Sequence, residues 1–214
     1  MARPTQPKAT RVLFVRHGAT PTTGAVLPGR APGLHLADQG RAQAEATAGR
    51  IGGLKGVAAV YASPLERTQE TAAPIGRALG LRVKVDKGLL EADFGDWTGA
   101  KLADLRKRSE WKAVQGHPSA FRFPGGESFA EMQGRVVGAT RRLCAAHPGA
   151  TIVLVSHADP IKAALNEALG AHLDAFQRIV VSPCSVSAVA YGPTSTVVLA
   201  VNTTEGDLGA LVAS

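Results

Sequence analysis

Five polar side chains of this sequence stand at, or a few residues after, the ends of short apolar runs. They are Arg16, His17, Arg67, Glu91 and His157. Two guanidinium groups can hold a phosphate through paired hydrogen bonds, and a neutral imidazole is a good nucleophile toward phosphorus. A carboxylic acid can protonate the oxygen that leaves, and Gly18 beside His17 would let the backbone approach the phosphate closely. These residue types favour chemistry on a phosphate ester.

A metal site is the competing interpretation. His17, His157 and Glu91 together resemble a set of zinc ligands. Arg16 and Arg67 would then lie beside a dication and repel it, so we expect no metal and no other cofactor. Each motif alone also has a purely structural explanation, such as a helix cap or a surface arginine. The argument for a site rests on the order of the motifs and on their shared placement at strand ends.

The elements that must position these side chains follow from the hydrophobic pattern. Apolar runs predict strands at 11–15, 57–62, 81–85 and 150–156, and a late hairpin at 185–192 and 195–202. Amphipathic segments predict helices at 38–53, 63–80, 128–146 and 159–170, with short ones around 101–115. Strands that alternate with helices predict an α/β protein, a three-layer α/β/α sandwich on a mostly parallel central sheet with a late antiparallel strand. Ligands bind beyond the carboxyl ends of parallel strands, so the five side chains are expected at one edge of the sheet.

Two of the helices carry signals for their ends. Ser63 with Glu66 three residues later predicts a capping box at the start of one helix, and Gly80 predicts its end. Ser128 and Glu131 have the same spacing at the start of the helix at 128–146. Ser63 is therefore expected to act as a cap.

Length and composition bound the class of protein. The chain has 214 residues, of which 45% are hydrophobic, and a net charge of +7. This is typical of a single globular domain, predicted at 11–205 with an insert or cap at 94–126. A flexible tail is expected at 1–10 and a second tail at 206–214. No apolar run approaches the ~20 residues of a membrane span, and the N-terminus lacks the apolar core of a signal peptide.

Charge and cysteine usage narrow the partners and the location. Cys144 and Cys184 form no CxxC pair and are expected as buried free thiols of a cytoplasmic protein. The cations are spread along the chain, and the adjacent ones at 106–108 and 141–142 are expected on solvated helix faces. We therefore expect no membrane or nucleic-acid partner, and a small phosphorylated substrate that the positive charge attracts. A homodimer is compatible with the sequence.

The motifs together have the pattern of a known family. In chain order they are "VRHGAT", "SPLERTQET", "LLEADFGDWTG", "FPGGES" and "VSHADPIKAAL", and they span roughly residues 11–192. This set resembles the histidine phosphatase superfamily in its phosphoglycerate mutase-like branch. The stretch from "FGDWTG" to "DAFQRIVVSPCSVS" is most similar to an actinobacterial subfamily of phosphomutases or phosphatases.

The resemblance implies a role for each matching residue. His17 would be the nucleophile that becomes phosphohistidine, and Glu91 would protonate the leaving group and then activate water. His157 would share in catalysis. The groups implied to hold the phosphoryl group are Arg16, Arg67, His157 and the backbone N–H of Ala158. Those implied to line the substrate pocket are Thr23, Arg30 and Phe94.

The resemblance leaves three functions to weigh. A phosphomonoesterase is favoured over a cofactor-dependent phosphoglycerate mutase, because mutases of the family carry a long insertion with paired arginines and a tyrosine where this chain has Phe94. A non-catalytic binding module would be expected to lack His17, Arg67 or Glu91. The aromatic residues of the cap either pack its core or face the pocket, and in the second case bulky monophosphates are the expected substrates.

Overall fold

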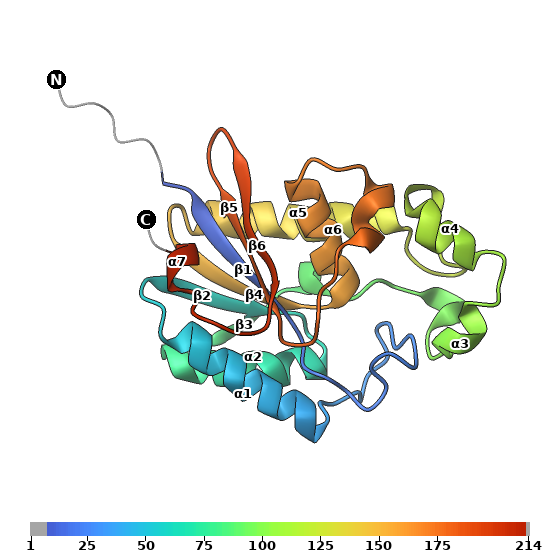
Figure 1. Ribbon diagram of the computed structural model, residues 1–214, viewed down its shortest axis with the longest axis horizontal. Coiled ribbons are helices and arrows are strands. Elements are labelled where there is room, and N and C mark those ends of the chain that lie inside the picture. Colours follow the sequence, from blue (N-terminus) through green and yellow to red (C-terminus); the bar gives the residue numbers. More distant parts are fainter. Residues whose placement is uncertain (1–7, 213–214) are drawn as a thin grey trace.

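The computed structural model describes residues 8–212 and is built on one six-stranded sheet (Figure 1). The strands are β1 (Thr10–Arg16), β2 (Val57–Ala62), β3 (Val83–Val85), β4 (Thr151–Ser156), β5 (Val186–Tyr191) and β6 (Thr196–Thr203). They lie in the order β3-β2-β4-β1-β5-β6. β1 to β4 run parallel, and β5 is antiparallel to both β1 and β6. The predicted mostly parallel sheet with a late antiparallel strand and a terminal hairpin is confirmed.

Helices cover both faces of the sheet. The α-helices are α1 (Asp38–Gly52), α2 (Glu66–Leu79), α3 (Leu102–Leu105), α4 (Trp111–Gly116), α5 (Phe129–Ala146), α6 (Ala158–Ala168) and α7 (Gly209–Val212). Figure 1 shows α1 and α2 on one side of the strands and α5 and α6 on the other. This is the three-layer sandwich that the alternation of elements predicted. Within residues 8–212, four 3₁₀ helices complete the order: η1 (Lys87–Leu89), η2 (Gly95–Trp97), η3 (Pro118–Ala120) and η4 (Leu173–Arg178).

β1 shows why its sequence is apolar without alternation. Val12 and Phe14 pack with α5 and α6, whereas Leu13 and Val15 pack with α1 and α2. All four side chains are at most 1% exposed. A strand buried on both faces needs apolar residues at every position. Burial of each such side chain stabilises the fold by about 1.5–3 kcal/mol.

The two predicted capping boxes have different outcomes. Ser128 and Glu131 form the reciprocal hydrogen bonds of a capping box at the start of α5, as predicted. α2 ends at Gly80, whose φ of 66° suits glycine. The start of α2 was predicted wrongly, because this helix begins at Glu66 with Leu65 at the cap and no side-chain cap bond. The Ser63 hydroxyl is engaged elsewhere, at the site described below.

Parts of the two predicted tails belong to the fold. Leu208 lies within the predicted tail 206–214, yet it is 1% exposed and packs in the same core cluster as Ile51 and Leu54. An apolar side chain that reaches the core holds this segment against the fold, and α7 follows it. At the other end Thr10 already belongs to β1, and residues 1–7 and 213–214 lie outside the described residues.

Two further predictions concern the cysteines and membranes. Cys144 and Cys184 are both free thiols, partly and fully buried respectively. Within residues 8–212, every helix is too short or too polar to cross a membrane.

Candidate active site

The edge of the sheet at the carboxyl ends of β1 and β4 brings two histidines together. Arg16 and Ser156 are the paired last residues of these neighbouring parallel strands. His17 and His157 come next, and their ring centroids are 5.3 Å apart. The predicted convergence of the two motifs is therefore present in the fold.

Gly18 has a structural role beside the two histidines. A Cβ on this residue would lie 2.5 Å from the carbonyl oxygen of Gly40 in α1, a distance at which the helix would have to shift. The Gly18 N–H donates to Thr71 Oγ1 at 3.0 Å and is thus already used. The small size of Gly18 is therefore needed for contact between the β1 loop and α1.

His17 is held in one tautomer. Its Nδ1 lies 2.8 Å from the carbonyl oxygen of Gly18, and a carbonyl only accepts, so Nδ1 carries the proton. Burial and then the charges of Arg67 and Arg16 lower the pKa of His17 to about 3. The ring is therefore neutral at physiological pH, and Nε2 keeps its lone pair. This is the state that a nucleophilic histidine requires.

His157 is completely buried and is oriented by the hydroxyl of Ser63. The two side chains are joined by a 2.9 Å hydrogen bond between His157 Nε2 and Ser63 Oγ. Burial, followed by the charge of Arg67, lowers the pKa of His157 well below its usual value. Its Nδ1 has no hydrogen-bond partner and lies 4.0 Å from Glu91 Oε2. Ser63 is thus a positioning residue that the capping interpretation missed.

The two arginines each use one guanidinium nitrogen to bind the fold. Arg16 Nη1 donates to the carbonyl of Val181 at 2.7 Å, and Arg67 Nη2 donates to that of Gly29 at 2.8 Å. Arg16 Nε and both Nε and Nη1 of Arg67 are buried without a hydrogen-bond partner. A buried charged donor left unpaired costs roughly 1–3 kcal/mol or more, and native proteins seldom leave several together. An anion such as a phosphoryl group is the kind of partner that these donors require.

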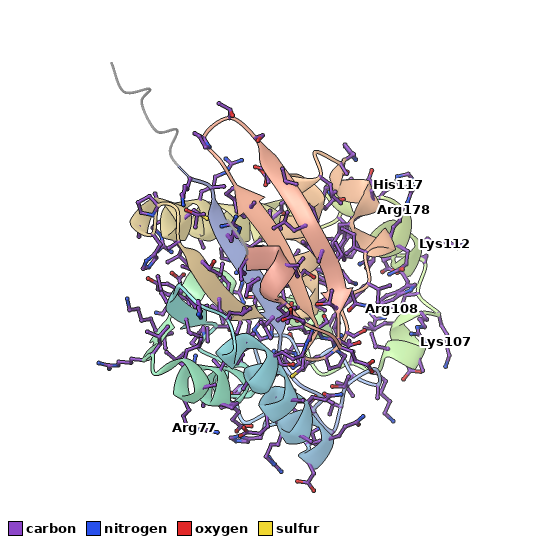
Figure 2. All side chains as sticks on the ribbon, turned by 60° about the vertical axis from the view of Figure 1, so that its left-hand side comes forward. Arg77, Lys107, Arg108, Lys112, His117 and Arg178 are labelled. Carbon is purple, nitrogen blue, oxygen red and sulfur yellow. The ribbon has the colours of Figure 1, made fainter. Side chains whose placement is uncertain are left out.

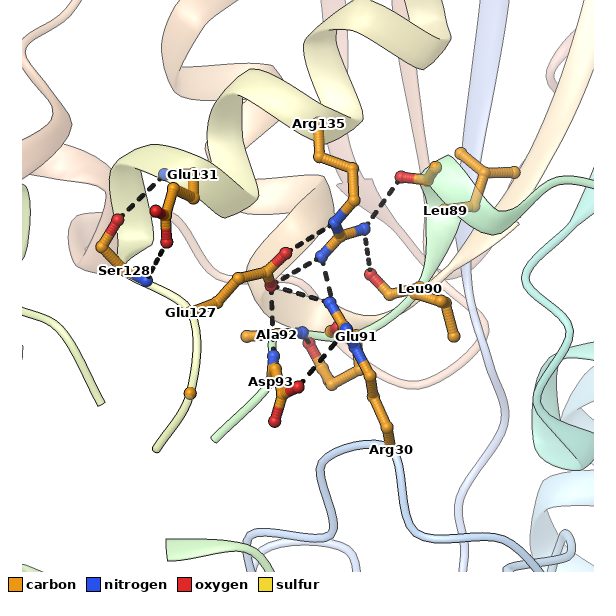
Figure 3. Close-up of polar contacts among 12 residues, drawn as sticks. Arg30, Leu89, Leu90, Glu91, Ala92, Asp93, Glu127, Ser128, Glu131 and Arg135 are labelled. Atoms are coloured by element: carbon orange, nitrogen blue, oxygen red, sulfur yellow. Dashed lines mark hydrogen bonds and ion pairs between the residues drawn. The ribbon is translucent and has the colours of Figure 1, made fainter. Parts of the chain in front are cut away.

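The backbone of Glu91 is clamped by two further arginines (Figure 3). Arg30 Nε and Arg135 Nη2 both donate to the Glu91 carbonyl oxygen, at 2.8 and 3.2 Å. Glu127 lies between the arginines and forms ion pairs with both. Sequence reasoning missed Arg135. The only signal for this clamp was Glu127 in the quoted "FPGGES" motif.

The Glu91 carboxyl group is shielded from water. Glu91 is 8% exposed, and its Oε1 accepts a hydrogen bond from the Ala92 N–H at 3.0 Å. Burial and then the charge of Asp159 raise the pKa of Glu91 to about 7, against opposing effects of Arg67 and Arg16. A carboxyl group with this pKa can donate a proton and take one back near neutral pH.

A cavity of about 250 Å³ opens over this constellation. Arg16, His17, Glu91 and Ala158, the first residue of α6, line its inner end. The N-terminus of a helix attracts anions, so α6 adds to the positive potential there. Arg67 and His157 are 0% exposed and lie behind the cavity surface rather than on it.

The predicted pocket residues separate into two groups. Thr23 and Phe94 line the cavity wall, and Thr23 Oγ1 also accepts a hydrogen bond from the Thr20 N–H at 2.8 Å. Arg30 is not among the lining residues of this cavity. Its guanidinium binds the Glu91 carbonyl and the carboxylates of Asp93 and Glu127 instead. The pocket role expected for Arg30 is therefore replaced by a clamp on the glutamate.

The donor set of this site does not form a metal-binding cluster. In the part of the chain that the structure describes, no three His, Cys, Asp or Glu side chains are grouped to hold a metal ion.

Comparison with known proteins places the chain in a family. The model of the histidine phosphatase superfamily (branch 1) matches residues 12–204. Bifunctional protein Rv2228c of Mycobacterium tuberculosis is 38% identical over 181 residues, which cover 83% of this chain and 49% of that protein. The chain thus spans about half the length of that curated relative. Phosphoserine phosphatase 1 of Hydrogenobacter thermophilus is 29% identical over 199 residues, which cover 91% of this chain and 92% of that protein.

A solved structure has the same fold. The structure of mycobacterial glucosyl-3-phosphoglycerate phosphatase Rv2419c superposes with a TM-score of 0.82 at 24% identity, over 92% of this chain and 100% of that one. The family match includes the ends of β1 and β4, where His17 and His157 lie. The chain belongs to the histidine phosphatase superfamily, in its phosphoglycerate mutase-like branch.

Proposed function

We propose that this protein hydrolyses phosphate monoesters through a phosphohistidine at His17. One observation carries the proposal. A neutral imidazole with a free Nε2 lies beside unpaired guanidinium donors of Arg16 and Arg67, and a carboxyl group with a raised pKa lines the same cavity. Nucleophile, phosphate cradle and acid are the three parts that this reaction needs.

The first half of the reaction transfers the phosphoryl group to the enzyme. His17 Nε2 attacks phosphorus, the N–P bond forms, and the bond from phosphorus to the ester oxygen breaks. Glu91 gives its proton to that oxygen, so the alcohol leaves neutral. The charge that builds up on the phosphoryl oxygens is met by Arg16, Arg67 and the N-terminus of α6.

The second half returns the enzyme to its starting state. Water attacks the phosphorus, the ionised Glu91 accepts one of its protons, and the N–P bond breaks. Inorganic phosphate leaves, and His17 and Glu91 are again neutral. A single carboxyl group serves as acid and then as base because its pKa lies near the working pH.

The relatives support a phosphatase in general terms. The names of two proteins compared above include a phosphatase activity, on phosphoserine in one case and on glucosyl-3-phosphoglycerate in the other. A phosphoglycerate mutase-type activity is the runner-up, and a non-catalytic binding module is third.

The test is to trap the intermediate and to compare substrates. The wild-type protein is mixed with a monoester and quenched in base, where phosphohistidine is stable, and the phosphorylated peptide is identified by mass spectrometry. We expect the label on His17 and none in His17→Ala. A label on another residue, or activity that is lost in EDTA, would overturn the mechanism. Conversion of bisphosphoglycerate-primed 3-phosphoglycerate to 2-phosphoglycerate faster than any monoester is hydrolysed would establish the mutase instead.

A further inference from the structure

The cavity over His17 adjoins a second one beneath the cap, because the two share part of their lining. The second cavity has a volume of about 300 Å³. Five residues line both cavities, and we call them the collar: Leu27, Phe94, Leu102, Asp159 and Lys162. A ligand with its phosphate at His17 would have to pass the collar to reach the second cavity, which we call the far chamber.

The collar has an apolar side and a charged side. Asp159 and Lys162 both come from the first turns of α6 and are about one-sixth exposed, at 18% and 17% of their side chains. Lys162 Nζ lies 3.4 Å from Asp159 Oδ1 and 3.2 Å from Gln177 Oε1. These contacts are long, so the carboxylate keeps capacity to accept hydrogen bonds from a ligand. Hydroxyl groups next to the phosphate are suitable donors.

The far chamber is suited to a flat ring. Its apolar walls include Trp111 from α4, together with Phe123 and Phe129. Trp111 is stacked on Trp97 with ring centroids 6.4 Å apart and planes 22° from parallel, which fixes the orientation of the indole. Gln115 and Gln177 add amide groups that can donate to and accept from heteroatoms of a ring. Apolar walls with a few polar groups are typical of small-molecule sites.

The surface around the cap is positively charged. Figure 2 shows Lys107, Arg108, Lys112 and Arg178 on the same side of the molecule, near α3, α4 and η4. The Arg108 guanidinium lies 5.5 Å from the Trp97 ring centroid. Such a field attracts phosphorylated ligands to the mouth of the cavity.

We propose that the substrates are monophosphates of a hydroxylated sugar that carries a planar ring, the chemistry of a nucleoside 5′-monophosphate. This proposal rests on the phosphatase function above. The phosphate binds at His17, the sugar hydroxyls donate to Asp159 in the collar, and the ring packs in the far chamber on Trp111. The ring supplies apolar area that a plain sugar phosphate lacks, so it raises kcat/KM by about tenfold or more.

The kinetic test compares two substrates that share a ribose 5-phosphate part, of which one carries a planar ring at C1′ and the other a hydroxyl group. Adenosine 5′-monophosphate and ribose 5-phosphate are hydrolysed by the wild-type protein, and the ratio of their kcat/KM values is the readout. We expect a ratio of about ten or more, which falls toward one in Trp111→Ala. Val114→Phe, which fills the chamber, is the second variant and should lower the ratio too. Leu169→Ala, at an exposed position outside both cavities, is the control, and thermal unfolding shows that each variant is folded.

A binding test separates this proposal from the phosphatase function. The chain has two tryptophans, so ligand contact with Trp111 can be followed by fluorescence in His17→Ala, which cannot turn over. We expect quenching by adenosine 5′-monophosphate that is lost in the added Trp111→Phe change, and none by ribose 5-phosphate. If adenosine 5′-monophosphate quenches the fluorescence but the wild-type protein hydrolyses no monoester, the phosphatase function is contradicted and the ring site is supported. A ratio of kcat/KM values near one, or no quenching by adenosine 5′-monophosphate, would overturn the ring site. Hydrolysis of ribose 5-phosphate in the same experiment would still support the phosphatase function.

Discussion

The two ends of the cavity are built in different ways. At the inner end, His17 and His157 each follow the last residue of a buried parallel strand, and their positions are set by the sheet. At the far end, Trp111 comes from α4, a helix of only six residues within the cap at 94–126. The inner end is specified by elements that hold the whole fold together, whereas the far end depends on local packing of aromatic rings.

Because of this difference, we expect the two ends of the cavity to control different properties of the reaction. Changes at the inner end should affect every substrate alike, because they remove the chemistry itself. Changes at the far end should alter which ester is preferred, because they touch only the alcohol part. Short helices held by side-chain packing can vary without loss of the sheet, so selectivity is the property that such a cap can change.

The largest effect is expected from His17→Ala. Without the nucleophile, kcat/KM should fall by several powers of ten for every monoester. Steady-state assays with a nitrophenyl ester and an alkyl ester measure the loss. His172→Ala, at an exposed ring outside the cavity, is the matched control and should retain wild-type rates. Full activity in His17→Ala would remove this residue from the mechanism.

Arg67→Ala should follow in size. Loss of charged hydrogen bonds to phosphate costs roughly 1.5–3 kcal/mol, about 10- to 150-fold in affinity. Because Arg67 is 0% exposed, the inhibition constant for inorganic phosphate is measured together with the thermal midpoint. Arg77→Ala changes an exposed arginine of the same helix and is the control. Unchanged kinetics with a much lower midpoint would show that Arg67 is structural.

Glu91→Gln should discriminate between leaving groups. An alkoxide needs a proton to leave, whereas a nitrophenolate needs little help. We expect a much greater loss of kcat for an alkyl ester than for p-nitrophenyl phosphate. Equal losses for both esters would contradict the assignment of Glu91 as the acid.

The residues at the inner end of the cavity were largely predictable from sequence. The residues that hold them in position were not. The apolar runs place His17 and His157 at the ends of two strands, and the carboxyl ends of parallel strands lie at the same edge of the sheet. Ser63 was misread because the same S-P-x-E spacing suits a helix cap, and only the pairing of β2 with β4 brings its hydroxyl to His157. Arg135 meets the Glu91 carbonyl from a helix 44 positions later, a contact that no local pattern reports.

One residue of the predicted C-terminal tail lies in the core for a related reason. Leu208 belongs to the segment 206–214, which was expected to be a tail. Its burial depends on a place in the core beside Ile51 and Leu54, which the chain reaches only once α1 is packed on the sheet. Local composition predicts where a regular element stops, but not whether an isolated apolar residue finds a partner.

Asp159→Asn tests the link between the collar and the inner end through pH. Burial, and then the Asp159 charge, raise the pKa of Glu91 to about 7, while Arg67 and Arg16 oppose them. Hydrolysis of an alkyl ester needs protonated Glu91, so kcat/KM should fall as pH rises through about 7. Removing the Asp159 charge lowers the pKa of Glu91, and the fall should then begin at lower pH. If kcat/KM falls over the same pH range in Asp159→Asn as in the wild type, the charge of Asp159 does not act on Glu91.

The smallest effect is expected from Arg30→Ala, and its pattern matters more than its size. Arg30 and Arg135 donate to the same Glu91 carbonyl, so one clamp remains when the other is removed. We expect kcat to fall by about a few-fold, equally for ribose 5-phosphate and adenosine 5′-monophosphate, with KM nearly unchanged, because a looser Glu91 slows proton transfer without touching the bound ester. Arg30→Lys keeps the charge beside Glu127 but loses the planar donor, so it should lie between wild type and Arg30→Ala. A rise in KM for one of the two esters alone would mean that Arg30 contacts the alcohol part of the substrate. Arg30 would then be a substrate-binding residue, as the sequence predicted.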